Sequence, residues 1–480
     1  MNTVQRLLSN TALAFLANVV SKASTSILFI LIGRILGPTA SGVFSLGTTY
    51  FTIVFGLSAL GLHELLVRQV APRREQSSRH FSNYLLLRAA FSLLTYLLLL
   101  IGLRVFLPYS PETTRAVLIL ALAALPEAVL DLCAALFEAH ERLGPPALAA
   151  VLNSAVKVAG GFWLLRQGAD VTALAWLMVA SATLSLLVMP PALLGLFRRT
   201  PQAAPARLDA RFSREQLRQT PSFFVIHLFS VLDYQTDAFL ISLLLTETDL
   251  GYYSAAMTIT LAISLMTFAV RAAIYPLMAR YAHGAPDKLA LLYEKANQYL
   301  IAVALPIAAA VCLLARPIIE LIFGAAFAPA VAALQVSVWA AVFLLVNVPN
   351  ARLLLVDNRQ RAAAWLTGVS MGTNVIANLI LIPTFGIFGA ALARVIASGA
   401  FFLSIHLYVR ANILRGRLLP LLPRPLLATA IMLAAMWPAR HLPLAAPIVI
   451  GAAAYLAAVL ILRVVPRDDL VYWRRVVSSK

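Results

Sequence analysis

Residues 9–33 read SNTALAFLANVVSKASTSILFILIG, a run of 25 residues in which Lys22 is the only charged side chain. A helix of about 20 apolar residues is long enough to cross the hydrocarbon of a bilayer. Similar runs follow one another almost to the end of the chain, separated by short connectors. We therefore predict an all-α polytopic membrane protein. Its fourteen predicted spans are 9–33, 42–63, 84–105, 116–139, 146–166, 171–197, 221–245, 252–276, 296–315, 328–350, 363–382, 386–409, 425–439 and 445–463.

The composition excludes a soluble multidomain protein. Of 480 residues, 61% are apolar and 12% are charged, and the mean hydropathy is +0.86. A net charge of +18 would suggest nucleic acid as the partner of a soluble chain. Here 27 of the 38 Lys and Arg residues fall on one side of the predicted spans. This is the positive-inside pattern, so we predict cytoplasmic termini and no nucleic-acid partner.

Several motif classes are missing from the sequence. We find no phosphate-binding GxxxxGK[ST] loop, no HExxH and no Cys/His metal spacing. Cys133 and Cys312 fall in or beside predicted spans and indicate neither a disulfide framework nor a metal site. The first apolar run ends in Gly33-Arg34 rather than a small-residue cleavage site, so we expect it to remain as a span. The sequence predicts a non-enzymatic protein without catalytic residues, bound metal or organic cofactor.

One long polar connector divides the chain. Residues 198–219, RRTPQAAPARLDARFSREQLRQ, predict a basic cytoplasmic linker, whose end is either an amphipathic surface helix or a solvated loop. We predict an N-terminal lobe of six spans at 1–197 and a second lobe of six spans at 220–410. Two extra helices and a cytoplasmic tail follow at 411–480.

A short internal echo favours two related lobes. Gly42-Val43-Phe44-Ser45 opens the second predicted span, and Gly251-Tyr252-Tyr253-Ser254 opens the eighth. Internal repeats are common in secondary transporters.

Charged residues inside spans are costly in lipid and therefore indicate function or specific pairing. Glu127, Asp131 and Glu138 share one helical face of the fourth span, and Asn153 and Lys157 lie one turn apart in the fifth. If these spans pack as an antiparallel pair, Lys157 faces Glu127 or Asp131. Such a pair either fixes helix packing or changes its charge state when ions or substrate bind.

The seventh span carries a second polar stripe, formed by His227, Ser230, Asp233 and Asp237. Two carboxylates one turn apart repel when both are ionised, so one holds a proton or shares a cation. Asp233 and Asp237 are therefore candidates for coupling to H⁺ or Na⁺. Burial against a neighbouring Arg or the lining of a water-filled vestibule are the alternatives.

Four cations are candidates for a cavity between the lobes: Lys22, Lys157, Arg271 and Arg394. A cationic cavity implies an anionic substrate, and phosphate is a frequent target of Lys and Arg. Arg271 lies near the cytoplasmic end of its span, where snorkelling to the surface is an alternative. Arg88, shallow in the third span, is expected to act as a topology anchor.

Three motifs resemble those of polysaccharide flippases of the multidrug/oligosaccharidyl-lipid/polysaccharide superfamily. Residues 31–71, LIGRILGPTASGVFSLGTTYFTIVFGLSALGLHELLVRQVA, are similar to the first hairpin of these flippases, with R-x-LGP at its start and GL…VR at its end. Asp237 followed by LGYYSAA at 250–256 looks like the start of the second lobe, and NLILIPTFGIFGAA at 378–391 resembles the eleventh and twelfth helices. The likeness covers roughly residues 1–410.

The resemblance implies a V-shaped bundle of six plus six helices with two helices added. Such proteins carry polyprenyl-diphosphate-linked glycans from the cytoplasmic to the outer leaflet of the bacterial inner membrane. Arg34 and Arg271 match regions where related flippases place substrate-facing arginines. The lipid bilayer and a polysaccharide polymerase or other assembly proteins are the implied partners.

Other functions are kept as alternatives. A peptidoglycan lipid-precursor flippase and a cation-coupled multidrug antiporter belong to the same superfamily. A membrane-embedded polymerising enzyme is disfavoured because no outer connector exceeds about 15 residues. A non-transporting scaffold that recruits a sugar polymerase is a further alternative.

Overall fold

A computed structural model describes residues 3–107, 109–198, 208–218, 220–264, 266–282, 284–357, 359–414 and 418–464. Over these residues the chain forms helices and connectors and no β-strand, so the all-α class is confirmed. The contacts divide the chain into unit 1, Met1–Ser254, and unit 2, Ala255–Lys480. The predicted lobe boundaries and the V-shaped arrangement of the lobes stay predictions.

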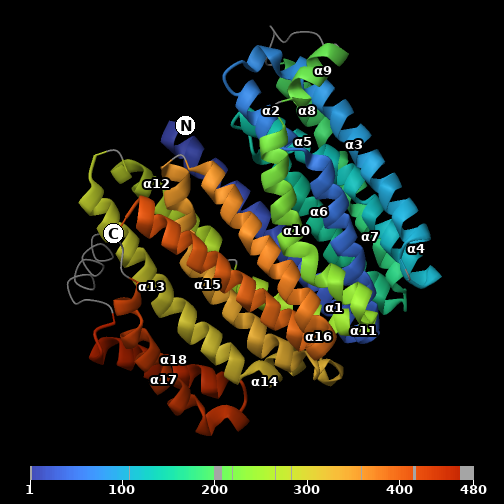
Figure 1. Cartoon of the computed structure of the whole chain (residues 1–480). Coiled ribbons are helices and arrows are strands. Elements are labelled where there is room, and N and C mark those ends of the chain that lie inside the picture. The colour runs from blue at the N-terminus through green and yellow to red at the C-terminus, as the bar shows by residue number, and fades with distance from the viewer. Residues whose placement is uncertain are drawn as a thin grey trace. The chain divides into compact units, whose positions relative to one another are not determined.

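Figure 1 shows the helices of each unit running side by side. Those of unit 1 are α1 (Thr3–Ala59), α2 (Leu62–Val70), α3 (Ser77–Val105), α4 (Pro111–Leu122), α5 (Ala124–Ala139), α6 (Gly144–Arg166), α7 (Val171–Leu186), α8 (Met189–Arg198), α9 (Ala210–Leu217), α10 (Pro221–Leu244) and the first half of α11 (Glu247–Ser264). Those of unit 2 are the rest of α11, α12 (Met266–Ala282), α13 (Pro286–Leu313), α14 (Ala315–Ile322), α15 (Ala330–Val356), α16 (Gln360–Asn412), α17 (Pro423–Met436) and α18 (Ala445–Ile461). Each predicted span coincides with one or two of these helices.

The described helices include stretches that suit a bilayer. Eight are long and apolar enough to cross a membrane. Two of the eight, Leu16–Ala59 and Arg361–Asn412, each overlap two predicted spans. On α3, Leu98 and Ile101 remain more than half exposed, as expected for side chains whose solvent is lipid. The protein is therefore a multi-pass helical membrane protein.

Each of the two longest helices bends where the sequence predicts a boundary between spans. In α1 the bend is at Gly37, with φ 85° and ψ −172°, and Pro38 follows it. This backbone conformation is open to glycine and strained for residues with a Cβ. In α16 the bend is at Gly386, three residues after Pro383. The chain thus reverses direction within each of these helices, as two separate spans require.

The fourth predicted span is divided into two helices. α4 ends at Leu122 and α5 begins at Ala124. Pro126 explains the break, because a proline lacks an N–H and its ring clashes with the carbonyl of the residue four positions earlier, here Leu122. The break sets the direction of α5, which carries Glu127, Asp131 and Glu138 on one face, hereafter the acidic stripe.

The internal echo corresponds to a close helix crossing within unit 1. A Cβ added to Gly42 of α1 would lie 1.7 Å from the Glu247 carbonyl oxygen, and one on Gly251 of α11 would lie 2.1 Å from the Pro38 carbonyl oxygen. Thr39 and Thr248 hydroxyls are 2.8 Å apart, and Ser45 hydrogen-bonds Ser254. Each pair is separated by 209 residues. The two segments of the echo therefore pack against each other, and small residues bring their backbones together.

The linker contains a helix, which confirms the helical alternative for 210–217; residues 199–207 and 219 lie outside the described part. α9 begins with Asp209, whose carboxylate accepts the backbone N–H groups of Arg211 and Phe212 at 3.0 Å. The same carboxylate pairs with Arg79 of α3 at 2.8 Å. Phe212 packs edge-on against His80, with ring centroids 5.0 Å apart. The linker helix is thus attached to the end of α3.

Replacing Asp209 by alanine is expected to release α9. The backbone N–H of Phe212 and the Arg79 guanidinium hold the pKa of Asp209 below its usual range. Its contribution to docking is therefore present above the ordinary carboxyl pKa and lost as pH falls below it. Limited trypsin digestion of the purified protein at neutral pH should cleave after Arg211 and Arg214 several-fold faster in Asp209→Ala.

A matched control is Asp170→Ala, which removes the side-chain cap of α7, where Asp170 accepts the Ala173 N–H at 2.9 Å. This variant should leave the linker cleavage rate unchanged. Equal cleavage rates in Asp209→Ala and the unchanged protein would contradict the docking role.

Unit 2 has its own apolar core between α12, α13, α15 and α16. Met278, Tyr293, Leu354 and Ile405 are each at most 1% exposed in this core. Tyr293 donates a hydrogen bond to Asn350 on α15 at 2.7 Å. Polar contacts therefore fix the relative positions of α13 and α15 inside the apolar core.

Candidate functional site: charged side chains within the membrane-spanning helices

Lys157 lies buried between α5 and α6. Its ammonium Nζ is 3.6 Å from Glu127 Oε1, and Asn153 Nδ2 donates to the same oxygen at 2.7 Å. The Lys157 side chain is 8% exposed and that of Glu127 is 23% exposed. The structure confirms that Lys157 faces Glu127, one of the two acids that the spacing allowed. The functional role of the pair stays a prediction.

This arrangement keeps one side of the ion pair accessible. An ammonium group has three donors, and Glu127 is a single contact at a distance longer than a direct hydrogen bond. A phosphate oxygen that reaches Glu127's exposed side can therefore compete for Lys157. Chemically, the site offers one cation in a medium of low dielectric, where an approaching anion is held strongly.

Arg88 of α3 is buried rather than at the membrane surface, so its expected role as a topology anchor is wrong. It is 1% exposed, and its Nη2 lies 3.6 Å from Asp131 Oδ2. Its guanidinium carbon lies 4.7 Å from the centre of the Phe55 ring. The sequence places Arg88 near the start of its span but does not show which face of that helix packs inward. In the structure Arg88 lies on the inward face of α3 and points toward α5.

His63 at the start of α2 connects two acids of the stripe. Its Nδ1 is 2.9 Å from Asp131 Oδ1, and its Nε2 is 3.2 Å from Glu138 Oε2. A neutral imidazole has a single N–H, so hydrogen bonds to two carboxylates need either an imidazolium or a protonated acid. His63 was not among the site residues predicted from the sequence. It could have been found as a histidine at the end of a predicted span, since an imidazole can pair with the carboxylates of the acidic stripe.

Arg88→Leu is expected to lower the yield of folded protein. Removing one partner of a buried ion pair typically costs about 3–5 kcal/mol when the other charge is left uncompensated. Asp131 keeps His63 as a partner, so we expect a loss at the lower end of this range, measured by thermal unfolding of the detergent-purified variant. Adding Asp131→Asn to Arg88→Leu should recover part of it, because the carboxylate that lost the guanidinium is then neutral.

The matched control for this prediction is Arg104→Leu, which removes an exposed arginine from the same helix. It should unfold close to the temperature of the unchanged protein. Arg88→Leu unfolding at that same temperature would show that the buried guanidinium contributes nothing.

The other predicted cations have different environments. Lys22 and Arg34 are exposed on α1, Arg271 is exposed on α12, and Arg394 is half-buried on α16. Lys22 and Arg34 are 12 residues apart on one continuous stretch of helix, which is roughly 18 Å. They are therefore too far apart to bind one phosphate together. Because these four cations and Lys157 are divided between both units, a single cavity that holds them stays a prediction.

The acids of α10 differ in burial. Asp237 is 1% exposed and accepts a hydrogen bond from the Tyr253 hydroxyl of α11. Asp233 is half-buried. The His227 side chain lies outside the described residues. The hydrogen bond from Tyr253 satisfies one carboxylate oxygen of the buried Asp237. The role of Asp233 and Asp237 in ion coupling stays a prediction.

The fold and the buried charges define a polytopic helical membrane protein with ion pairs between its helices. The chain belongs to the polysaccharide biosynthesis protein family, whose model matches residues 30–332. Its helices superpose on those of lipid II flippase MurJ in an inward closed conformation with a TM-score of 0.74. That comparison covers 95% of this chain and 99% of MurJ at 14% identity. An inward-facing multidrug resistance MATE family transporter gives a TM-score of 0.63 over 82% of this chain and 95% of its own, at 15% identity. These likenesses show the fold.

Two curated relatives match parts of the sequence. The probable low-salt glycan biosynthesis flippase Agl15 of Haloferax volcanii is 24% identical over 286 residues, 58% of this chain and 57% of the relative. The uncharacterized membrane protein MJ1068 of Methanocaldococcus jannaschii is 28% identical over 145 residues, 30% of this chain and 29% of the relative. The chain thus matches about half, or less, of these relatives' length. The proteins with a described function are flippases and transporters rather than enzymes.

Proposed function

We propose that this protein moves a polyprenyl-diphosphate-linked oligosaccharide from the cytoplasmic to the outer leaflet of a bacterial cytoplasmic membrane, for the assembly of cell-surface polysaccharide. The observation that carries the proposal is Lys157, a buried cation inside a membrane-spanning helix with a partly exposed counter-ion. Membership of the polysaccharide biosynthesis protein family supports the same conclusion. The name of the Haloferax volcanii relative, a probable glycan biosynthesis flippase, supports it further.

In this proposal the diphosphate displaces Glu127 from Lys157. The incoming anion carries more negative charge than one carboxylate and offers several acceptor oxygens, so it binds the ammonium more strongly. Release on the outer side restores the Lys157–Glu127 pair and prevents an uncompensated buried charge in the empty protein. The polyprenyl tail stays in lipid, and the cycle proceeds by alternating access.

Energy for the cycle comes from an ion gradient or from the membrane potential. Asp233 and Asp237 on α10 are the groups that would bind H⁺ or Na⁺. A negative-inside potential acts on each charge that moves, at about 2.3 kcal/mol per charge per 100 mV. A polysaccharide polymerase or another assembly protein in the same membrane would consume the exported glycan.

Depletion of the protein in its own cells tests this function. The expected result is a build-up of polyprenyl-linked glycan on the cytoplasmic leaflet together with loss of surface polysaccharide. Expression of the wild-type gene should reverse both effects. Build-up of the peptidoglycan lipid precursor instead would assign the protein to that substrate. Increased sensitivity to cationic drugs without any lipid-linked intermediate would assign it to multidrug transport. Either of these results would overturn the proposal.

A further inference from the structure

Unit 2 contains an apolar pocket that the proposed transport route does not use. Its volume is about 650 Å³, within the range of pockets that hold small-molecule ligands. It lies between α13, α15, α16 and residues 418–422, directly before α17. The lining residues are Ile301, Leu305, Trp339, Val342, Phe343, Val346, Phe402, Leu403, His406, Leu407, Arg410, Leu418, Pro420 and Leu422.

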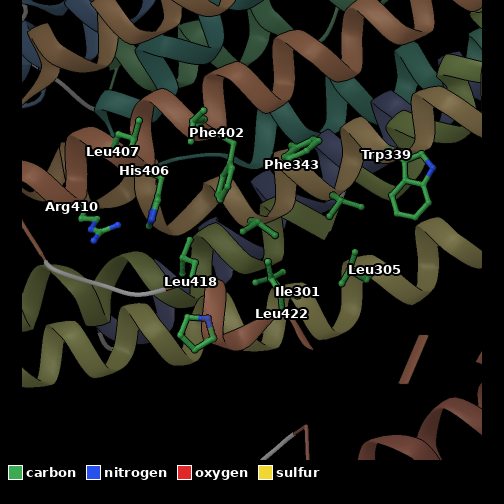
Figure 2. A pocket seen from close by; sticks show the side chains of 14 residues that line it. Ile301, Leu305, Trp339, Phe343, Phe402, His406, Leu407, Arg410, Leu418 and Leu422 are labelled. Carbon is green, nitrogen blue, oxygen red and sulfur yellow. The ribbon is translucent and has the colours of Figure 1, made fainter. Parts of the chain in front are cut away.

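The polar side chains of the pocket gather at one end. Figure 2 shows Arg410 and His406 together on one side and Trp339 at the opposite end. Arg410 and His406 are one turn apart on α16, so both occupy the same helical face. Among the described residues, no carboxylate pairs with Arg410. The pocket therefore combines a long apolar wall with a cationic end.

Hydrogen bonds orient His406. The Tyr293 hydroxyl donates to Asn350 Oδ1 at 2.7 Å, and it lies 3.1 Å from His406 Nδ1. Because that hydroxyl has already given its proton to Asn350, His406 Nδ1 must be the donor in the second contact. His406 Nε2 is then the ring's remaining polar atom. The imidazole also stacks on Phe402, with centroids 5.8 Å apart.

The stretch of α16 that lines the pocket is comparable in length to the hydrocarbon of one leaflet. Arg410 lies two residues before the end of α16, at the surface end of a predicted span. From Arg410 to Phe402 the helix rises roughly 12 Å. One leaflet contributes about 15 Å of hydrocarbon, half of the bilayer core. A lipid whose phosphate contacts Arg410 can thus place an acyl chain along the apolar wall toward Trp339.

We propose that this pocket binds an acyl chain of an anionic phospholipid of the cytoplasmic leaflet, with the lipid phosphate on Arg410. A zwitterionic lipid has the same chain but carries its own cation, which weakens the attraction to an arginine. A free phosphate ion lacks the chain that fills the apolar wall. The proposal concerns a membrane lipid that stays bound, and it is independent of the substrate that the protein transports.

Thermal unfolding of the purified full-length protein in detergent tests the headgroup contact. Phosphatidylglycerol should raise the unfolding temperature more than phosphatidylcholine does. Arg410→Gln should abolish that difference, and Arg361→Gln, an exposed arginine at the other end of α16, should retain it. An equal difference in Arg410→Gln and the unchanged protein would overturn the proposal.

Fluorescence tests the chain contact without relying on stability. Phosphatidylglycerol with bromine near the end of its acyl chain should quench the fluorescence of Trp339, and Trp339→Phe should lose that component. Leu305→Phe, which enlarges a lining side chain without adding an indole, should also reduce the quenching of Trp339. A polyprenyl monophosphate is the competing ligand of the same chemistry. If it displaces the brominated lipid at a far lower concentration than phosphatidylglycerol does, the site belongs to the carrier lipid and the proposal is wrong.

Discussion

Replacing Lys157 by methionine is expected to reduce surface polysaccharide by roughly ten- to hundredfold, since a hydrogen bond to a charged group contributes about 1.5–3 kcal/mol and 1.4 kcal/mol is a factor of ten. Lys157 Nζ lies 3.6 Å from Glu127, so the single variant also leaves a carboxylate uncompensated. Complementation of a depleted strain measures the loss, with the amount of protein in the membrane measured in parallel.

A double variant separates the two roles of Lys157. Replacement of a buried ion pair by apolar residues of similar size is often neutral for stability. Lys157→Met combined with Glu127→Met should therefore restore the amount of folded protein but not transport. If the double variant also restores surface polysaccharide, the pair only fixes the packing of α5 against α6. Lys288→Met, at an exposed lysine of α13, is the control and should be fully active.

Gly42→Ala is expected to be strongly destabilising, although alanine is the better helix former. The added Cβ would lie 1.7 Å from a backbone carbonyl, so no side-chain rotation relieves the clash. The helices must move apart, which breaks the Thr39–Thr248 and Ser45–Ser254 hydrogen bonds. Overpacking of this kind typically costs about 1–3 kcal/mol.

Gly102→Ala is the matched control for the crossing. Gly102 lies in α3, and apart from the backbone of its own helix turn nothing lies within 4 Å of the added Cβ. Its substitution should be neutral or stabilising by up to about 1 kcal/mol, the difference in helix propensity. Thermal unfolding of both variants in detergent measures the contrast. A Gly42→Ala protein that unfolds at the same temperature as Gly102→Ala would contradict the close crossing of α1 and α11.

The helical fold was predictable because lipid imposes a simple rule on sequence. A span must be apolar over its whole length, so its bounds can be read without knowing its neighbours. The bends at Gly37 and Gly386 were predictable as span boundaries for the same reason. A kink at Pro126 was predictable from the proline itself, but the division of the fourth span into two helices was not, because the apolar run continues through it.

The pairing of charged side chains was less predictable. Spacing alone put Lys157 opposite Glu127 or Asp131, and the packing of α5 on α6 decided between them. Arg88 and His63 show the limit of this approach. A helix whose whole circumference is apolar carries no periodic signal for the face that packs inward, so the burial of Arg88 could not be read from the sequence. The contact between Gly42 and Gly251 was present as a sequence echo, but an echo shows similarity and not contact.

The leaflet position of a labelled glycan lipid tests the account most directly. Purified protein is reconstituted into liposomes that contain a polyprenyl-diphosphate-linked oligosaccharide, with and without an imposed membrane potential, and a glycosidase is added outside. We predict that the enzyme digests nearly all of the glycan in vesicles with the unchanged protein. In vesicles with Lys157→Met/Glu127→Met, or without protein, it should digest only the outer-leaflet share. If the inner-leaflet glycan stays protected in vesicles with the unchanged protein under both conditions, the protein does not move this lipid.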